Sequence, residues 1–222
     1  MFRTPGFYNV DCMDMMREFP DNYFDLAIVD PPYGAGGNKA FDGRFGGKGS
    51  RFQKYRASDE RISEWDVAPN QEYFDELWRV SKNQIIWGGN YFQLPPTRCF
   101  VVWRKLTISE KFSMAMAEYA WTSFTTNAKI FSCAPQSKQG DKRFHPCQKP
   151  IELYEWLLKM YAKPGDKILD THVGSASSII ACIKNGFSVW GTEINSEYYE
   201  KAKERISRMT AQTNIWENLN ET

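Results

Sequence analysis

The segment Asp30-Pro31-Pro32-Tyr33 combines an acid, two prolines and an aromatic ring directly after the apolar run at 25–30. Proline fixes φ and lacks an N–H group, so this tip of the chain is stiff and offers carbonyl acceptors. The Asp30 carboxylate and the Pro31 carbonyl can accept the two hydrogens of an exocyclic amine, while Tyr33 stacks on the ring that carries the amine. We therefore interpret residues 30–33 as a site that holds an aromatic amine.

Holding an aromatic amine in this way prepares it for alkylation. The lone pair of such an amine is delocalised into its ring, and acceptors that draw the hydrogens out of the ring plane localise the pair towards an electrophile. A methyl-sulfonium is already activated, so in-line transfer between well-oriented partners requires neither a metal nor a covalent intermediate. The departing proton has two candidate acceptors, Asp30 and water, and the sequence leaves both open. The alternative interpretation is a rigid loop with a solvent-facing Tyr33.

A second segment with chemical potential is the small-residue turn within KILDTHVGSASS, at 167–178. Gly174 and Ser175 allow close approach of a ligand, and the following helix presents unpaired N–H groups. Glu193 lies about twenty residues further on, at the end of the next predicted strand, where an acid can bind ribose hydroxyls. The turn is not GxGxxG and has no Walker lysine, so the sequence favours an adenosine without phosphates, such as S-adenosylmethionine. A tight strand–helix connection is the alternative.

These segments must be positioned by strands and helices that alternate along the chain. Apolar patterning predicts strands at 7–10, 25–30, 84–87, 99–103, 117–124, 128–131, 167–170 and 187–192, with 128–131 pairing with 117–124. It predicts helices at 12–19, 71–80, 150–161, 177–184 and 196–209, with a frayed tail after Thr210. We expect one α/β domain over 1–222, with a doubly wound, mostly parallel, Rossmann-like sheet of seven strands.

The composition and the cysteine pattern argue against a membrane-spanning protein and against a Cys/His metal site. Hydrophobic residues make up 42% and charged residues 25%, and no apolar run approaches the roughly 18 residues that a membrane span needs. The five cysteines are scattered, and no CxxC pair or His/Cys cluster indicates a metal site. The N-terminus lacks the apolar core of a signal peptide, so we expect reduced thiols and a cytoplasmic protein without membrane contact. Because the net charge is only +1, affinity for nucleic acid must come from local charge.

Three stretches together resemble the amino-group DNA methyltransferases. They are DPPYG at 30–34, HPCQKP at 145–150, and ILDTHVGSAS followed by GTEINSEYYEKAKERI between 168 and 206. The Asp-Pro-Pro-Tyr segment precedes the glycine turn, and this order resembles the circularly permuted β-type arrangement of that family. The resemblance covers nearly the whole chain except the basic insert described below.

The resemblance implies a role for each motif. Asp30, Pro31, Pro32 and Tyr33 would be catalytic, and S-adenosylmethionine would be the cofactor. The implied cofactor-binding residues are Asp170, Thr171, Gly174 and Ser175 at the methionine part, Glu193 at the ribose, Asp11 near the adenine, and His145 and Lys149 at the amino-acid end. The helix opened by 145–150 would close over that end.

The chain departs from the family pattern at a few positions. The family turn is usually Phe-x-Gly-Ser-Gly, whereas this chain has His172, Val173 and Ala176, and Cys147 stands where threonine is commoner. Of these, only Ala176 bears on the cofactor assignment. Because the first motif residue is Asp30 and not serine, the resemblance implies adenine N6 as the target. Cytosine N4, RNA or protein-amide methylation, and a non-catalytic DNA-binding protein of the same fold are the alternatives.

The stretch KAFDGRFGGKGSRFQKYR at 39–56, within a glycine-rich insert at 34–66, follows the catalytic tip directly. Its interleaved aromatic rings can stack on unstacked bases, and its cations can bind phosphates. The only acid in this stretch is Asp42. We expect DNA contacts from its six cations, Lys39, Arg44, Lys48, Arg51, Lys54 and Arg56. The target base must be flipped out, since its amino group cannot meet a buried sulfonium while it is stacked. A solvated loop is the alternative.

A second variable region, at 127–144, lies where β-type enzymes carry a target-recognition domain. It is short, so three explanations remain open: a small recognition surface suffices, the insert reads the DNA sequence, or a second subunit completes the reader. A homodimer and a cognate restriction nuclease, as in restriction–modification systems, are partners that the resemblance leaves open.

Overall fold

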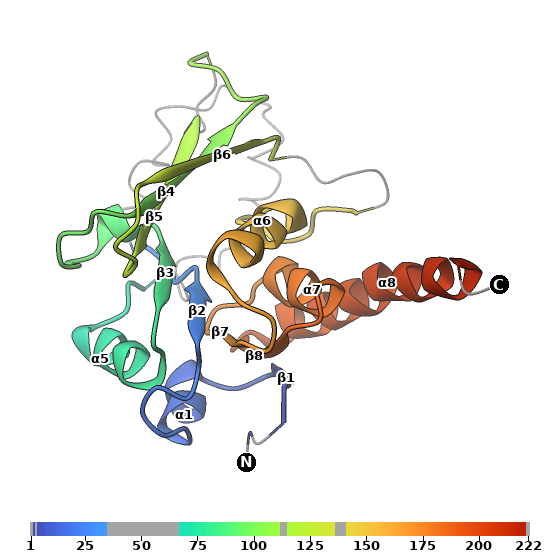
Figure 1. Ribbon diagram of the computed structural model, residues 1–222, viewed down its shortest axis with the longest axis horizontal. Coiled ribbons are helices and arrows are strands. Elements are labelled where there is room, and N and C mark those ends of the chain that lie inside the picture. Colours follow the sequence, from blue (N-terminus) through green and yellow to red (C-terminus); the bar gives the residue numbers. More distant parts are fainter. Residues whose placement is uncertain (1, 3, 35–66, 112–114, 136–140, 221–222) are drawn as a thin grey trace.

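The computed structural model describes residues 2, 4–34, 67–111, 115–135 and 141–220, with only the backbone described over 212–220. Eight strands form one sheet in the order β1-β8-β7-β2-β3-β5-β4-β6 (Figure 1). Their bounds are β1 Gly6–Tyr8, β2 Leu26–Val29, β3 Gln84–Trp87, β4 Phe100–Lys105, β5 Ala117–Thr122, β6 Lys129–Cys133, β7 Lys167–Asp170 and β8 Ser188–Thr192. The helices are α1 Cys12–Arg17, α5 Gln71–Val80, α6 Ile151–Tyr161, α7 Ser177–Lys184 and α8 Ser196–Asn220, with a 3-10 turn η1 at Gly89–Tyr91.

The sheet has one strand more than the expected seven, and its last pairing also differs from the expectation. β4 and β5 form an antiparallel hairpin, and β5 also pairs with β3, so both edges of β5 are occupied. β6 therefore cannot pair with β5 and instead runs parallel to β4 at the edge of the sheet. The remaining strand pairs are parallel.

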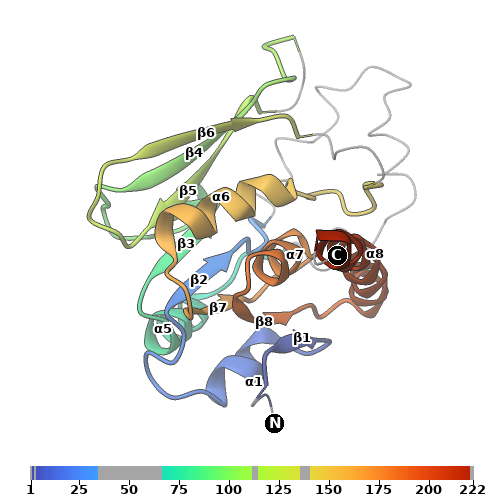
Figure 2. The same ribbon diagram turned by 45° about the vertical axis from the view of Figure 1, so that its right-hand side comes forward.

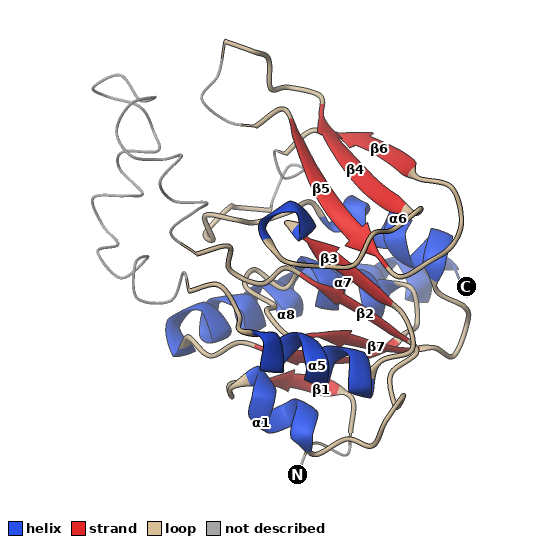
Figure 3. Cartoon of the chain, turned by 90° about the vertical axis from the view of Figure 1, so that its left-hand side faces the viewer, coloured by secondary structure: helices blue, strands red, loops and turns tan. Residues whose placement is uncertain are grey.

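The sheet is buried on both faces because its central strands alternate between two apolar clusters. Leu26 and Ile28 of β2 face the cluster that includes α6, α7 and α8, whereas Ala27 and Val29 face the cluster that includes α1 and α5. Figures 1 and 2 show these two groups of helices on opposite sides of the sheet, and Figure 3 shows α1 and α5 in front of it. The doubly wound α/β fold is thus confirmed.

The last helix is longer than the sequence predicted. We expected it to end near Met209 and to fray after Thr210, but α8 continues to Asn220. Residues 210–220 contain neither proline nor glycine, so nothing in the local chain stops the helix. In the described part of the chain, no helix has the length and apolarity that a bilayer crossing requires.

The winding changes direction between β2 and β7, which are direct neighbours. From β2 the chain continues through α5 to β3 on one side, and from β7 it continues through α7 to β8 on the other. In open α/β sheets, ligands bind beyond the carboxyl ends of the strands at such a switch point.

Candidate active site

Three acids gather at the carboxyl ends of three adjacent parallel strands. Asp30 directly follows β2, Asp170 ends β7, and Glu193 directly follows β8. The registers of these strand pairs place the three strand ends along the same edge of the sheet. The structure therefore brings the Asp-Pro-Pro-Tyr tip and the glycine turn together at the switch point, although 140 residues separate Asp30 from Asp170 in sequence.

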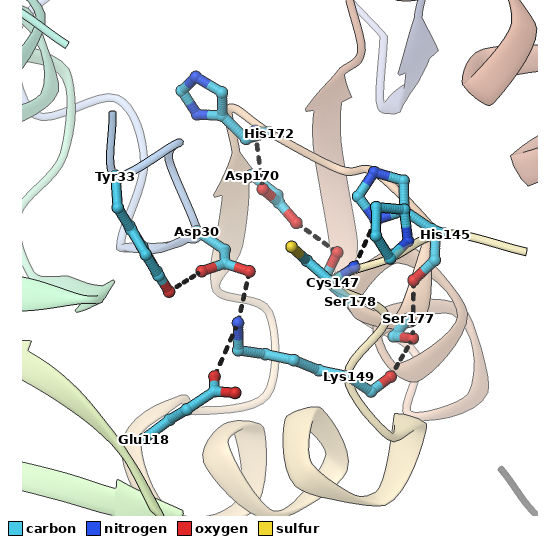
Figure 4. Close-up of polar contacts among 12 residues, drawn as sticks. Asp30, Tyr33, Glu118, His145, Cys147, Lys149, Asp170, His172, Ser177 and Ser178 are labelled. Carbon is cyan, nitrogen blue, oxygen red and sulfur yellow. Dashed lines mark hydrogen bonds and ion pairs between the residues drawn. The ribbon is translucent and has the colours of Figure 1, made fainter. Parts of the chain in front are cut away.

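The Asp30 carboxylate, which we interpret as an acceptor for an amine, contacts two of the protein's own side chains. Its Oδ1 accepts a hydrogen bond from the Tyr33 hydroxyl at 2.7 Å, and its Oδ2 accepts one from Lys149 Nζ at 2.5 Å. Figure 4 shows the Lys149 ammonium between Asp30 and Glu118. An incoming amine can use the remaining lone pairs of the carboxylate or replace one of these two donors.

Lys149 belongs to a compact cluster of alternating charges. Glu118, on β5, lies 3.2 Å from Lys149 Nζ through Oε2 and 2.6 Å from Lys105 Nζ through Oε1. Lys149 is only 4% exposed, and its ammonium also lies 5.3 Å from the centre of the Trp87 ring. Two acids and two lysines thus neutralise each other beside the strand ends.

The pKa values follow from this pairing. Burial opposes the charge on Glu118, but Lys149 and Lys105 outweigh it and lower the pKa of Glu118 to about 2. Burial likewise opposes the charge on Lys149, yet the Asp30 and Glu118 carboxylates raise the Lys149 pKa well above its usual value. Lys149 therefore stays protonated near neutral pH and cannot act as a general base.

The Tyr33 ring packs against Gly88, where a side chain would leave no room for it. Gly88 has a φ of +66°, and a Cβ at that position would lie 2.1 Å from Tyr33 Cε1. Burial, followed by the nearby Asp30 charge, raises the Tyr33 pKa well above its usual value, so the hydroxyl remains protonated and donates to Asp30. The ring is thereby fixed relative to the carboxylate.

The glycine turn connects β7 to α7, as the sequence predicted. Gly174 lies at a φ of +53°, and its N–H donates to Glu193 Oε2 at 3.0 Å. Glu193 Oε1 accepts from the Asn195 N–H at 2.9 Å. Ala176 stands where the family pattern has glycine, and it adopts a φ of +65°, the left-handed conformation that glycine favours. The substitution therefore leaves the shape of the turn intact.

Asp170 is buried beneath this turn. Its Oδ1 accepts the His172 N–H at 3.0 Å, and its Oδ2 accepts a hydrogen bond from the Ser178 hydroxyl. Burial is the main cause that raises the Asp170 pKa to about 7, although these two hydrogen bonds lower it. Thr171 is also buried, and its hydroxyl lies 2.7 Å from that of Tyr73.

The segment at 145–150 lies against the glycine turn. A Cβ at Gly174 would meet the His145 ring at 3.2 Å, and that ring packs edge-on against Tyr198. Burial is the main cause that lowers the His145 pKa to about 3, so the imidazole is neutral. His145 does not cap a helix, because α6 begins after Pro150.

Asp11 has a local structural role at the start of α1. Its Oδ1 caps the helix by accepting the Met13 N–H at 2.7 Å, and the residue is exposed. β1 pairs with β8, so Asp11 and Glu193 follow neighbouring strands. The position is consistent with the adenine role that the resemblance implies, while the carboxylate is engaged in capping.

The sequence interpretation missed two charged residues near the site, Glu118 and Arg205. Arg205 is 1% exposed and pairs through Nη2 with Asp141 Oδ2 at 2.7 Å. It also donates to the Ser175 carbonyl at 2.5 Å and to the Ser177 hydroxyl at 2.9 Å, so it ties α8 to the glycine turn. Arg205 continues the apolar stripe of α8 that holds Tyr198 and Ala202, and this is the sequence signal for it. Glu118 lies in the half-exposed part of β5 and has no such signal.

Part of the expected DNA surface lies outside the described residues. This applies to Lys39, Arg44, Lys48, Arg51, Lys54 and Arg56. The described part of the region at 127–144 contains β6, which is an edge strand of the sheet. Among the described residues, no group of three or more His, Cys, Asp or Glu side chains could hold a metal ion.

The sequence has relatives among known families and proteins. The profile of the DNA methylase family of N6- and N4-methyltransferases matches residues 48–204. The "Putative methylase YubD" of Escherichia coli K12 is 24% identical over 219 residues, which covers 90% of this chain and 89% of that protein. Type II methyltransferase M.HpaI of Haemophilus parainfluenzae is 41% identical over 66 residues, or 30% of this chain and 21% of that protein.

Solved structures share the fold. The structure of the PvuII DNA methyltransferase, which is cytosine-N4-specific, superposes with a TM-score of 0.60 at 13% identity, covering 95% of this chain and 93% of that one. The complex of M1.HpyAVI with SAM superposes with a TM-score of 0.53 at 15% identity, covering 90% and 98%.

Proposed function

The chain belongs to the DNA methylase family of N6- and N4-methyltransferases, and from this premise we propose that it methylates the N6 amino group of adenine in DNA. S-adenosylmethionine is the methyl donor of this family. The proposal rests on one observation above all: the Asp30–Tyr33 pair follows β2, which pairs directly with β7, the strand that ends in Asp170 and leads into the glycine turn. An amine held at the first site faces a ligand held at the second.

The amine side is built around a fixed carboxylate. The Tyr33 hydroxyl holds Oδ1 of Asp30, so the amine can take the Oδ2 position that Lys149 occupies in this structure. Lys149 keeps Glu118 as a counter-ion when it leaves Asp30, and its charge therefore stays compensated. Asp30 would then draw the amine hydrogens towards itself and orient the nitrogen lone pair towards the neighbouring turn. Pro31 and Pro32 keep this tip rigid.

The cofactor side fits a cationic nucleoside. Asp170 and Glu193 are acids with raised pKa values beside a turn whose glycine has a positive φ, and a cation placed there would favour their ionised forms. Bound S-adenosylmethionine would supply a methyl group on a positively charged sulfur. The proposed binding residues are Asp11, His145, Lys149, Asp170, Thr171, Gly174, Ser175 and Glu193.

Adenine is preferred to cytosine in this proposal because the first residue of the tip is Asp30, an acid, and the resemblance associates an acid there with adenine. The proposed enzyme flips its target base out of the duplex, since the strand-end site cannot reach a stacked amino group. The basic insert is the proposed DNA contact of the chain.

Incubation of the purified protein with radiolabelled S-adenosylmethionine and unmethylated DNA, followed by nucleoside analysis, tests the proposal. We expect label in N6-methyladenine. Label in N4-methylcytosine would show that the target is the smaller base cytosine, with the same mechanism, and would overturn the adenine assignment. Absence of label in both, together with DNA binding, would support the non-catalytic alternative. Labelled RNA or protein in parallel reactions would indicate a different substrate class.

A further inference from the structure

Tyr91 lies against the Tyr33 ring, at the amine side of the site. The two ring centres are 4.8 Å apart and the planes differ by 17°, so the rings are stacked. Tyr91 is 50% exposed, which is unusual for a large side chain that covers a residue of the site. It is the last residue of the 3-10 turn η1, which connects the end of β3 to the rest of the chain.

Two other described residues contact the Tyr33 ring, and both are held by the sheet or the core. Gly88 contacts the ring through its backbone, and its N–H is bonded to the Tyr119 carbonyl on β5 at 2.9 Å. Phe92 meets the ring edge-on and also packs on Phe74, within the cluster that covers the sheet. Of the ring neighbours that the structure describes, Tyr91 is therefore the one that can move into solvent without disturbing the core.

The hydroxyl of Tyr33 sets the position of any ring that stacks on it. Because that hydroxyl is bonded to Asp30, a planar base on the Tyr33 face has one edge close to the Asp30 carboxylate. In this structure the Tyr91 ring occupies that stacked position. A base can enter only if Tyr91 withdraws, and the shortest withdrawal leaves Tyr91 stacked on the outer face of the base.

We propose that Tyr91 is the second wall of the binding site for the flipped base, and that the base enters between the rings of Tyr33 and Tyr91. This inference rests on the proposed function and extends it to a residue outside the recognised motifs. In the free protein Tyr91 keeps the face of Tyr33 covered, and in the complex it shields the outer face of the base from water. The proposal requires no change in the backbone that carries Asp30.

The test uses the full-length protein and a duplex in which 2-aminopurine replaces the methylated base, once the position of that base has been mapped by sequencing of methylated DNA. We expect Tyr91→Ala to weaken DNA binding by roughly 5- to 150-fold, the range for loss of one base–aromatic stack, and to raise 2-aminopurine fluorescence in the complex because one quenching ring is gone. Tyr91→Phe should match the wild type, and Tyr91→Leu, which keeps apolar cover without a planar ring, should resemble Tyr91→Ala.

Two controls separate this proposal from its premise. An Ile183→Ala variant alters a 45% exposed apolar residue near the C-terminal end of α7, outside every proposed contact with DNA or cofactor, and should bind DNA normally. A duplex with an abasic target position should bind equally well to wild type and Tyr91→Ala, since no base is left to stack. Tighter DNA binding by Tyr91→Ala would show that Tyr91 only obstructs the site. Unchanged DNA binding would show that Tyr91 does not contact the base. Either result overturns the inference. Failure of the wild type to methylate DNA would instead overturn the proposed function.

Discussion

The ammonium of Lys149 lies 2.5 Å from the Asp30 carboxylate, and these two residues are 119 positions apart in the chain. The pair is nearly buried, and Glu118 stands 3.2 Å from the same ammonium. Lys149 thus has two acidic partners, of which Asp30 faces the proposed amine site. If an amine displaces Lys149 from Asp30, as proposed, Glu118 remains as its counter-ion.

The Asp30 carboxylate is expected to be indispensable for methyl transfer. Asp30→Asn keeps the size of the side chain but replaces one acceptor oxygen by a donor, which repels an amine hydrogen. We expect the rate of methyl transfer to fall by at least about 100-fold, as for other positioned polar groups at reaction centres, while cofactor affinity changes little. Asp25→Asn, the same substitution at the opposite end of β2, is the control. Full turnover by Asp30→Asn would remove Asp30 from the mechanism.

Glu118 is expected to be required for stability because it neutralises two lysines that are almost completely buried. Glu118→Gln leaves both ammonium groups without this counter-charge, and we expect the free energy of unfolding to fall by about 3 kcal/mol, as when one partner of a buried ion pair is removed. Urea denaturation at pH 7 measures this change. Glu197→Gln, in an exposed pair with Lys201 on α8, should change stability little. A similar loss in both variants would contradict the special role of the cluster.

Cofactor affinity is expected to fall as the pH drops below about 7, because the Asp170 pKa is raised to about 7. Protonation removes the negative charge that a cationic ligand meets, so binding at pH 6 should be weaker than at pH 8 and should release protons near pH 7. Calorimetry in buffers of different ionisation enthalpy measures that release. Asp170→Asn should bind weakly at both pH values, and an unchanged proton release in this variant would assign the titration to another group.

The same raised pKa predicts the opposite trend for the stability of the free protein. The folded state binds the Asp170 proton more tightly than the unfolded chain, whose carboxyl has the ordinary value of 3.8. This contribution to stability is fully present below about 3.8 and is lost as the pH rises through about 7. Added cofactor should weaken this decline between about pH 3.8 and pH 7, because a bound cation favours the ionised carboxylate. Thermal unfolding across this range, with and without cofactor, provides the measurement.

Gly88 is expected to be essential for the position of Tyr33. Gly88→Ala introduces a Cβ 2.1 Å from the Tyr33 ring as well as a residue with a φ of +66°, so Tyr33 must move away from Asp30. The control is Gly186→Ala, where φ is +72° but a Cβ would meet nothing within 4 Å. Both variants should lose about 1–2 kcal/mol of stability from the left-handed conformation, and only Gly88→Ala should lose methyl transfer. Equal activity of the two would contradict the packing argument.

The basic insert is expected to bind DNA phosphates. Replacing Arg44, Lys48 and Arg51 together by alanine should weaken DNA binding and reduce its dependence on salt, by a slope of about 0.9 for each phosphate that the variant no longer neutralises. Cofactor binding should be unaffected. Titrations at several salt concentrations measure the slope, and an unchanged DNA affinity would show that the insert does not bind DNA.

Much of the fold was predictable because the signals are local. The continuous apolar run before Asp30 indicated a strand covered on both faces, and the structure buries all four residues of β2. The pairing of β6 was not predictable from the sequence. Because β5 already pairs with β3 and β4, β6 can pair only with the free edge of β4. Strand order depends on which edges remain open after other elements have packed.

The residue types of the site could be read from the chain alone: an acid with a rigid proline tip after one strand, and a glycine turn with a following acid around two others. The partners of those residues emerged only on folding, with Lys149 on Asp30, Glu118 on Lys149, Arg205 on the glycine turn and Tyr91 on Tyr33. Backbone conformation and apolar periodicity are set by neighbours in the chain. Ion pairs and ring stacks between distant residues depend on the order in which strands adjoin, which is set by packing of the whole sheet.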